Sequence, residues 1–286
     1  MDKILVTGAT GQVGHAVVEA LVARGMTVRA ATRKTTRIRW TDRIQPVVFD
    51  YGDAGLHRAA LSGMSGLFLV APPLDADAPA KLNPFIDKAK EMGVRHVVFN
   101  SALGMDINEQ SPLRRIERHL MRSGLGYTIL RPNFFMENFS TGFAAPMVEN
   151  GGIFFAAGDG RTSFISVEDI AKVAATAFQE KRLGVEYNLT GPEALDYAQV
   201  VRIISEVSGR TVTYHAISEE AMLKGARDQA MQESAVQYLA LLYAAVREGL
   251  MARVTDDVRE VTGETPISFG EFAKKNAASW KLSKAA

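Results

Sequence analysis

Three glycines near the start of the chain are spaced to bind the phosphates of a nucleotide. Gly8, Gly11 and Gly14 follow the apolar run at residues 4–6 and open an amphipathic helical pattern. One glycine permits a tight turn, one lets backbone N–H groups approach a pyrophosphate, and one lets the helix pack closely on the strand. The helix N-terminus adds its dipole. The stretch therefore predicts a dinucleotide site, rather than a purely structural turn, with further contacts from Thr10, Gln12 and Val13.

The residues after the second expected strand indicate which dinucleotide the site favours. An NAD site usually carries an acidic residue there, which binds the ribose 2′-hydroxyl. This chain has Arg33 and Lys34 instead, with Arg37 and Arg39 close behind. A guanidinium fork and an ammonium suit a phosphate on the ribose, whereas the alternative is a solvated basic loop. We therefore expect NADP(H) as the cofactor.

Other candidate cofactor contacts follow the carboxyl ends of expected strands, the edge at which open α/β sheets bind ligands. Asp50 follows the third strand and is a candidate partner for the adenine amino group, or a turn-forming aspartate, with Tyr51 next to it. The remaining candidates follow the fourth, fifth and sixth strands: Ala71, Pro72, Pro73, Asn100, Ser101, Pro132, Asn133 and Phe134.

Alternation of apolar strands and helical patterns predicts the fold class. Six short strands are expected at 4–6, 27–31, 44–49, 67–70, 94–99 and 127–130. Strands separated by helices are typical of a doubly wound α/β (Rossmann) fold, a parallel sheet covered on both faces. We expect residues 1–131 to form the dinucleotide-binding domain and residues 166–190 to return to it. Residues 132–165 and 191–286 then form a smaller C-terminal substrate lobe, in which a strand is expected over 211–215.

Composition limits the partners and the location. The chain has 286 residues, 47% of them hydrophobic, and a formal net charge of +1, so bulk charge indicates no nucleic-acid partner. The absence of cysteine excludes disulfides and thiolate metal ligands, and the five histidines lack ligand spacing, so no metal is expected. No apolar run approaches ~18 residues, which predicts no membrane span. The first strand begins directly after residue 3, leaving no room for a signal peptide, so we expect a cytoplasmic protein. We expect it to be a monomer or a homodimer.

The proton donor common in nicotinamide-dependent ketone reductases is missing. Short-chain dehydrogenases/reductases usually carry a Tyr-x-x-x-Lys pair, but none of the seven tyrosines is followed by lysine four residues later. Reduction of a simple ketone needs a proton for the developing alkoxide. The sequence therefore favours acceptors that delocalise the charge, such as quinones or conjugated aromatics.

Eight segments along the chain carry a family resemblance: VTGATGQVG, TRK, FDYGD, FLVAPP, HVVFNSALG, TILRPNFFMENF, FISVEDIAKVAA and YNLTGPEALDYAQVV. With them the chain resembles, nearly from end to end, the NmrA-like branch of atypical short-chain dehydrogenases/reductases. This branch includes NADPH-dependent quinone reductases, triphenylmethane-dye and azo-dye reductases, and redox-sensing regulators. The resemblance implies that residues 71–73 line the nicotinamide ribose and that Ser101 lies near the ring, which makes Ser101 the only catalytic candidate. More distant relatives often carry lysine or histidine four residues before the glutamate that corresponds to Glu117, where this chain has Leu113.

The substrate wall is expected after the sixth strand and in a late helix, which is predicted over about 229–249. An apolar cleft with a few polar groups suits an aromatic acceptor, although such clustering is also typical of plain core. The candidates are Phe135, Met136, Asn138, Phe139 and Tyr238.

Together these features predict an NADPH-dependent reductase that passes hydride to a quinone or another conjugated aromatic acceptor. Two alternatives stay open. One is an NADP(H)-binding redox sensor that does little chemistry, and the other is a reductase or isomerase of a biosynthetic intermediate.

Overall fold

Seven parallel strands pair in the order β3-β2-β1-β4-β5-β6-β8 in the computed structural model, which describes residues 2–35 and 41–280. Most of their residues are buried, as expected for a parallel sheet with both faces covered. The strand order reverses direction at β1, which creates the switch point where doubly wound sheets bind ligands. The predicted fold class is confirmed. The strands are β1 (Lys3–Val6), β2 (Thr27–Thr32), β3 (Ile44–Val48), β4 (Gly66–Val70), β5 (His96–Asn100), β6 (Gly126–Pro132) and β8 (Val185–Leu189).

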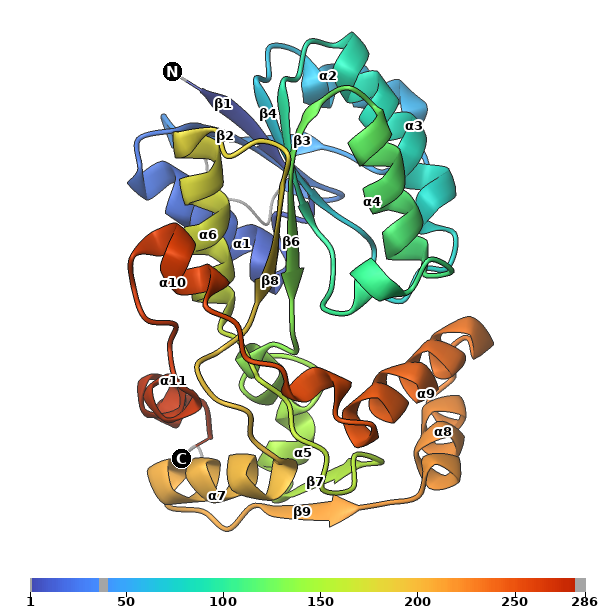
Figure 1. The fold of residues 1–286 in the computed structure, drawn as a ribbon, viewed down its shortest axis with the longest axis vertical. Coiled ribbons are helices and arrows are strands. Elements are labelled where there is room, and N and C mark those ends of the chain that lie inside the picture. The colour runs from blue at the N-terminus through green and yellow to red at the C-terminus, as the bar shows by residue number, and fades with distance from the viewer. Residues whose placement is uncertain (1, 36–40, 281–286) are drawn as a thin grey trace. The chain divides into compact units, whose positions relative to one another are not determined.

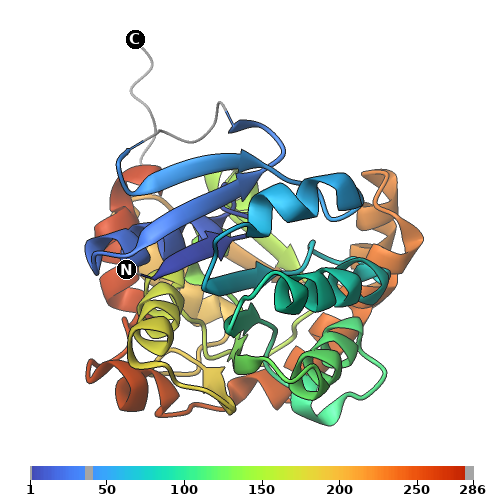
Figure 2. The same cartoon turned by 90° about the horizontal axis from the view of Figure 1, so that it is seen from above.

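Helices cover both faces of this sheet, as Figures 1 and 2 show. α1 (Gln12–Ala23) and α6 (Val167–Glu180) lie side by side on one face. α2 (Ala54–Leu61), α3 (Ala78–Glu91) and α4 (Pro112–Arg122) cover the other. The second group closes over a continuous apolar core that includes Leu5, Leu69, Phe85, Phe99 and Ile116.

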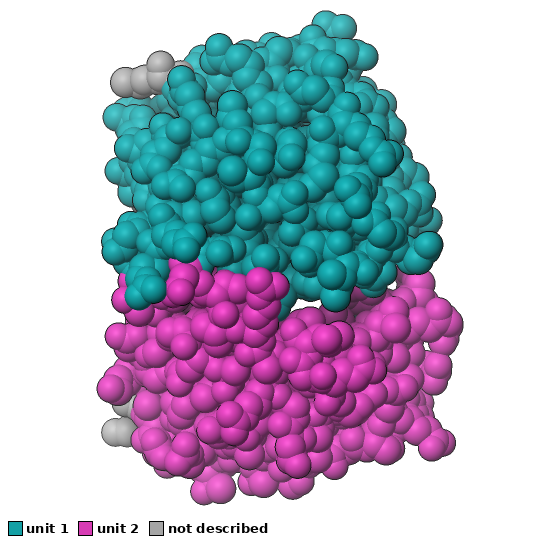
Figure 3. All heavy atoms as spheres, in the orientation of Figure 1, with its two compact units in different colours: residues 1–132, 167–189, 257–264 teal, residues 133–166, 190–256, 265–286 magenta. Residues whose placement is uncertain are grey.

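The chain divides into two compact units, coloured separately in Figure 3. Unit 1 contains residues 1–132, 167–189 and 257–264, and unit 2 contains residues 133–166, 190–256 and 265–286. Residues 257–264, predicted to lie in the C-terminal lobe, instead belong to unit 1. The reason is that α10 (Asp257–Thr262) packs on α6, and Asp257 accepts a hydrogen bond from the backbone N–H of Asn188 in β8 (2.5 Å).

Unit 2 is built around a two-stranded parallel sheet, of which β7 (Gly152–Phe155) was not predicted and β9 (Thr213–Ala216) was. Its core is aromatic, with the ring of Phe139 in edge-to-face contact with Phe164 and Phe269. A predicted helix over 229–249 is shorter, because Ala230 has a positive φ of 58° and separates two helices. The helices are α5 (Ala145–Glu149), α7 (Tyr197–Ser208), α8 (Glu219–Asp228), α9 (Glu233–Arg247) and α11 (Phe269–Asn276).

Candidate functional site

The glycine turn between β1 and α1 has the geometry of a phosphate cradle. Gly8 has a positive φ of 62° and its carbonyl accepts from the Gly11 N–H (2.9 Å). A Cβ on Gly14 would lie 2.2 Å from the Gly8 carbonyl oxygen, so only glycine fits there. Gly11 is the N-cap of α1 and has no side chain to cap it, and no acidic residue lies in the first turn. The helix dipole and backbone N–H groups are therefore available to an anion, which fits a pyrophosphate.

Thr7 and Tyr51 hold the neighbouring strand ends in place. Thr7 Oγ1 donates to the Phe68 carbonyl (3.1 Å) and accepts from the Val70 N–H (2.9 Å). The Tyr51 hydroxyl donates to the Val70 carbonyl (2.8 Å), and burial raises the pKa of this hydroxyl, so it stays protonated. Both residues thus fix the point at which the loop at 71–73 leaves β4. Direct contact of Tyr51 with a cofactor stays a prediction, as does contact by residues 71–73.

Two exposed cations follow β2. Neither Arg33 nor Lys34 forms an ion pair with any residue in 2–35 or 41–280. Thr32 Oγ1 accepts from the Lys34 N–H (3.2 Å) and so shapes the turn that carries them. Arg37 and Arg39 lie outside the described residues. The charges of Arg33 and Lys34 are therefore free for an anionic ligand.

Asp50 forms a turn, which was the alternative to a contact with adenine. It is exposed, and its Oδ1 accepts from the Gly52 N–H (2.9 Å), while its own carbonyl accepts from the Asp53 N–H (3.2 Å). Its proposed contact with adenine stays a prediction.

A buried charge network lies behind the end of β5. Glu117 of α4 is fully buried and accepts two hydrogen bonds from the guanidinium of Arg131 in β6, one from Nε (3.0 Å) and one from Nη2 (2.8 Å). Arg114 Nη1 donates to the same carboxylate (2.8 Å), and Arg131 also bonds Glu186 of β8. The network ties α4, β6 and β8 together through charge-assisted bonds. Sequence reasoning noted Glu117 and missed Arg131, although an arginine within the apolar strand TILRP was the available signal.

The network keeps Glu117 ionised. Burial alone would raise the pKa of Glu117, but the hydrogen bonds from Arg131, Ser101 and Arg114 outweigh it and hold the pKa below its ordinary value of 4.5. For Arg131, burial would lower the guanidinium pKa, yet its bonds to Glu117 and Glu186 keep that pKa above its ordinary value. Both groups are therefore charged at neutral pH.

Stability should accordingly fall in acid. Because the pKa of Glu117 is lower in the folded than in the unfolded chain, its contribution is fully present above about pH 4.5 and is lost as pH falls through the folded-state pKa. We expect Glu117→Gln to weaken the pH dependence of the unfolding free energy below pH 5, measured by urea denaturation at several pH values. Glu19→Gln, at an exposed site, should keep the wild-type dependence. An unchanged dependence in Glu117→Gln would contradict the assignment.

Ser101, the catalytic candidate, belongs to this network. It follows β5, is 5% exposed, and its Oγ donates to Glu117 Oε1 at 2.5 Å. Leu113, four residues before Glu117, packs against the apolar core and offers no proton. A catalytic role for Ser101 stays a prediction.

Asn100 and Pro132 end the strands on either side of this site. Asn100 is buried, and within residues 2–35 and 41–280 its Oδ1 has no hydrogen-bond partner. An unsatisfied buried oxygen at the ligand-binding edge of the sheet fits a site completed by a ligand donor. The Pro132 carbonyl accepts from the Leu103 N–H (2.9 Å), which fixes the segment after Ser101.

Asn133, the first residue of unit 2, uses its side chain to join two segments. Its Nδ2 donates to Ser163 Oγ (2.7 Å) and to the Met251 carbonyl (2.8 Å), and its Oδ1 accepts from the Phe134 N–H (2.9 Å). All its side-chain polar atoms are therefore used inside unit 2, and a side-chain contact with the cofactor is not supported.

The predicted substrate wall separates into core and half-exposed residues. Met136 and Phe139 are buried in unit 2, so they are part of its core and do not line an open site, a correction to the prediction. Phe134, Phe135, Asn138 and Tyr238 are half-buried. Phe134 contacts the ring of Tyr243 edge-to-face. Substrate contact by the half-buried residues stays a prediction.

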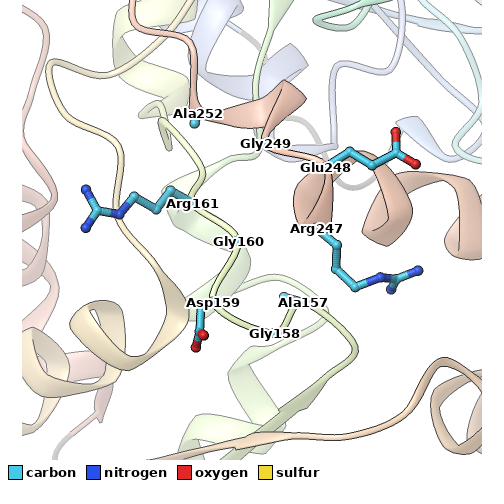
Figure 4. Close-up of a pocket in the computed structure, with 9 residues that line it drawn as sticks. All are labelled: Ala157, Gly158, Asp159, Gly160, Arg161, Arg247, Glu248, Gly249 and Ala252. Atoms are coloured by element: carbon cyan, nitrogen blue, oxygen red, sulfur yellow. The ribbon is translucent and has the colours of Figure 1, made fainter.

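Unit 2 contains an open pocket of about 570 Å³, shown in Figure 4. Five of its nine lining residues are glycine or alanine, and the other four carry charged side chains. Arg247 bonds the Ala156 carbonyl (2.6 Å) and Glu219, whereas Arg161 is exposed and makes no ion pair with a described residue. The lining comprises Ala157, Gly158, Asp159, Gly160, Arg161, Arg247, Glu248, Gly249 and Ala252.

Within the described ranges, no helix is long and apolar enough to cross a membrane. Over the same ranges, no three His, Asp or Glu side chains gather as metal ligands.

Comparison with known proteins places the chain. A model of the NmrA-like family matches residues 1–272. The chain belongs to the NmrA-like family. The resemblance predicted from its motifs is therefore confirmed.

Proteins similar to this chain include named reductases. NAD(P)H azoreductase of Xenophilus azovorans is 32% identical over 284 residues, which cover 97% of this chain and 99% of the relative. Prestalk A differentiation protein A of Dictyostelium discoideum is 32% identical over 279 residues, covering 96% and 92%. The crystal structure of an NADPH-dependent quinone oxidoreductase from Escherichia coli, complexed with NADPH, matches with a TM-score of 0.82 at 26% identity, covering 95% and 99%.

Proposed function

We propose that the protein is an NADPH-dependent reductase that transfers hydride to a quinone or another conjugated aromatic acceptor. The observation that carries the proposal is the glycine turn, where no side chain caps the N-terminus of α1, together with Arg33 and Lys34 after β2, which make no ion pair with any described residue. Both features suit a dinucleotide with a phosphate on the ribose. The azoreductase and quinone oxidoreductase relatives support the same chemistry. The test is acceptor-dependent oxidation of NADPH by the purified protein.

The chain's own residues bind and orient the reactants. NADPH, when bound, supplies the hydride. The glycine turn holds the phosphates, and Arg33 and Lys34 hold the ribose phosphate. Related enzymes often carry lysine or histidine four residues before the glutamate that corresponds to Glu117, but this chain has Leu113 there, packed against the apolar core. Because Leu113 cannot donate a proton, the acceptor must delocalise the charge it receives. A conjugated acceptor meets this requirement.

The pocket of unit 2 is our candidate for the acceptor. Its volume lies in the range typical of small-molecule sites, and its glycine and alanine walls suit a flat ring. Asn133 directly follows β6 and fixes both segments that lead into the lining, through Ser163 and Met251. Asn133, the first residue after β6, thus anchors the two segments that carry the lining of this pocket.

Arg33→Ala combined with Lys34→Ala should weaken NADPH binding about 10-fold to 100-fold, because hydrogen bonds to charged groups are worth about 1.5–3 kcal/mol. NADH affinity should stay within about twofold, which isothermal titration with both nucleotides measures. Lys224→Ala, an exposed lysine of α8, is the control and should change neither affinity. Equal loss for NADPH and NADH would contradict recognition of the ribose phosphate.

Ala252→Phe should raise the KM for the acceptor about tenfold or more by filling the pocket of Figure 4, with the Kd for NADPH unchanged. The matched control is Ala240→Phe, which fills a second groove of about 380 Å³ between α8 and α9. Steady-state kinetics with one quinone and one azo dye measure both variants. If Ala240→Phe raises the KM and Ala252→Phe does not, the acceptor pocket is misassigned.

A further inference from the structure

The hydroxyl of Ser101 donates its hydrogen bond to the buried carboxylate of Glu117. Glu117 Oε1 accepts from Ser101 Oγ (2.5 Å) and Arg131 Nε (3.0 Å), and Oε2 accepts from Arg114 Nη1 and Arg131 Nη2, each at 2.8 Å. An ionised carboxylate only accepts hydrogen bonds, so Ser101 must be the donor in this pair. The Ser101 oxygen is then left with lone pairs and no proton to offer a ligand.

We propose that Glu117 is a positioning residue that makes Ser101 a hydrogen-bond acceptor. Ser101 Oγ then accepts a hydrogen bond from the carboxamide N–H of the bound nicotinamide. This inference rests on the proposed function, because it needs a nicotinamide cofactor. It assigns Ser101 to cofactor orientation and removes it as a proton donor to substrate.

The strand order places Ser101 on the nicotinamide side of the site. The pyrophosphate belongs at the β1–α1 turn, and the adenosine ribose belongs beyond β2, where Arg33 and Lys34 lie. The other half of the dinucleotide must therefore extend in the opposite direction, over the ends of β4 and β5. Ser101 immediately follows β5, and it keeps a small exposed area, 5% of its surface.

The network that holds Ser101 is rigid. Arg131 grips Glu117 with two parallel bonds, and Arg114, which is itself buried, adds a third. Arg114 Nε is held in turn by Glu109 (3.0 Å). A carboxylate fixed by two guanidinium groups cannot rotate away from the hydroxyl, so the acceptor lone pairs of Ser101 keep one direction.

The experiment compares NADP⁺ with its 3-acetylpyridine analogue, in which a methyl ketone replaces the carboxamide and removes its N–H donors. Isothermal titration gives, for each variant, the ratio of the Kd of the analogue to the Kd of NADP⁺. We expect Ser101→Ala to weaken NADP⁺ binding about fivefold and to leave binding of the analogue unchanged, so that the ratio falls by the same factor. Ser101→Thr, which keeps the hydroxyl, should restore the wild-type ratio. The control is Ser111→Ala, another buried serine of unit 1, whose hydroxyl bonds Met105 Sδ.

The outcomes separate this inference from the proposed function. Failure of the wild type to bind NADP⁺ would overturn the proposed function and the inference together. If the wild type binds and Ser101→Ala changes both Kd values equally, or neither, Ser101 is not the acceptor and the inference is wrong. Glu117→Gln, if folded, should reduce the ratio as Ser101→Ala does, and an unchanged ratio would remove Glu117 from its positioning role. Because Ser101→Ala leaves the ion pairs of Glu117 with Arg131 and Arg114 in place, the test does not depend on Glu117→Gln folding.

Discussion

Arg131→Met is expected to lower the free energy of unfolding by about 3–5 kcal/mol, because it leaves a buried carboxylate without its main partner. The methionine would fill much of the arginine volume but would remove both fork bonds to Glu117 and the bond to Glu186. Glu117 is fully buried, so its carboxylate would lose its main compensating charge while staying out of reach of water. Urea denaturation at pH 7 measures the loss.

Arg118→Met is the matched control for this experiment. Arg118 lies on α4, next to Glu117, and donates to Glu109 (2.6 Å), but its side chain is 43% exposed. Exposed ion pairs contribute about 0–1 kcal/mol, so the control should stay close to wild type. Equal effects from the two substitutions would mean that burial does not govern the strength of this network.

Gly14→Ala is expected to raise the Kd for NADPH about 10-fold to 100-fold and to lower the unfolding free energy by about 1–3 kcal/mol. The new methyl group would lie 2.2 Å from the Gly8 carbonyl oxygen and 2.6 Å from its carbon, and both are backbone atoms. The turn must therefore move, and with it the N–H groups that face the phosphates. Isothermal titration and urea denaturation give the two values.

Gly225→Ala provides the comparison within a helix. A Cβ at Gly225 meets no atom within 4 Å, and the residue lies in α8. It should leave NADPH binding unchanged and stabilise the protein by up to about 1 kcal/mol. Wild-type NADPH affinity in Gly14→Ala would contradict the placement of the phosphates at this turn.

The parts of the fold that are formed by consecutive residues were predictable from the sequence. The glycine turn was readable because its strand, turn and helix are consecutive, and every predicted strand of the sheet has a counterpart in the structure. β7 was not, since the short run GIFF lies in a segment without alternating elements and pairs with β9, some 60 residues away. Such pairing depends on tertiary contact and leaves no local signal.

The candidate site divides in the same way. Arg33 and Lys34 could be recognised from the sequence because they occupy the position at which an NAD site usually carries an acidic residue. The role of Arg131 emerges only when β6, α4 and β8 meet, because its partners Glu117 and Glu186 lie 14 and 55 residues away. Met136 and Phe139 were misassigned for a related reason: aromatic and apolar residues after a strand look alike whether they line a pocket or fill a core.

Hydride transfer from NADPH to a conjugated acceptor is tested most directly by following the oxidation of NADPH by the purified protein in the presence of a panel of quinones, azo dyes and triphenylmethane dyes. We expect NADPH to be consumed only when an acceptor is added, at least one conjugated acceptor to support turnover, and NADH to be used at least about tenfold less efficiently. Tight binding of NADPH without oxidation by any acceptor would contradict the proposed reductase function and favour a nucleotide-sensing role.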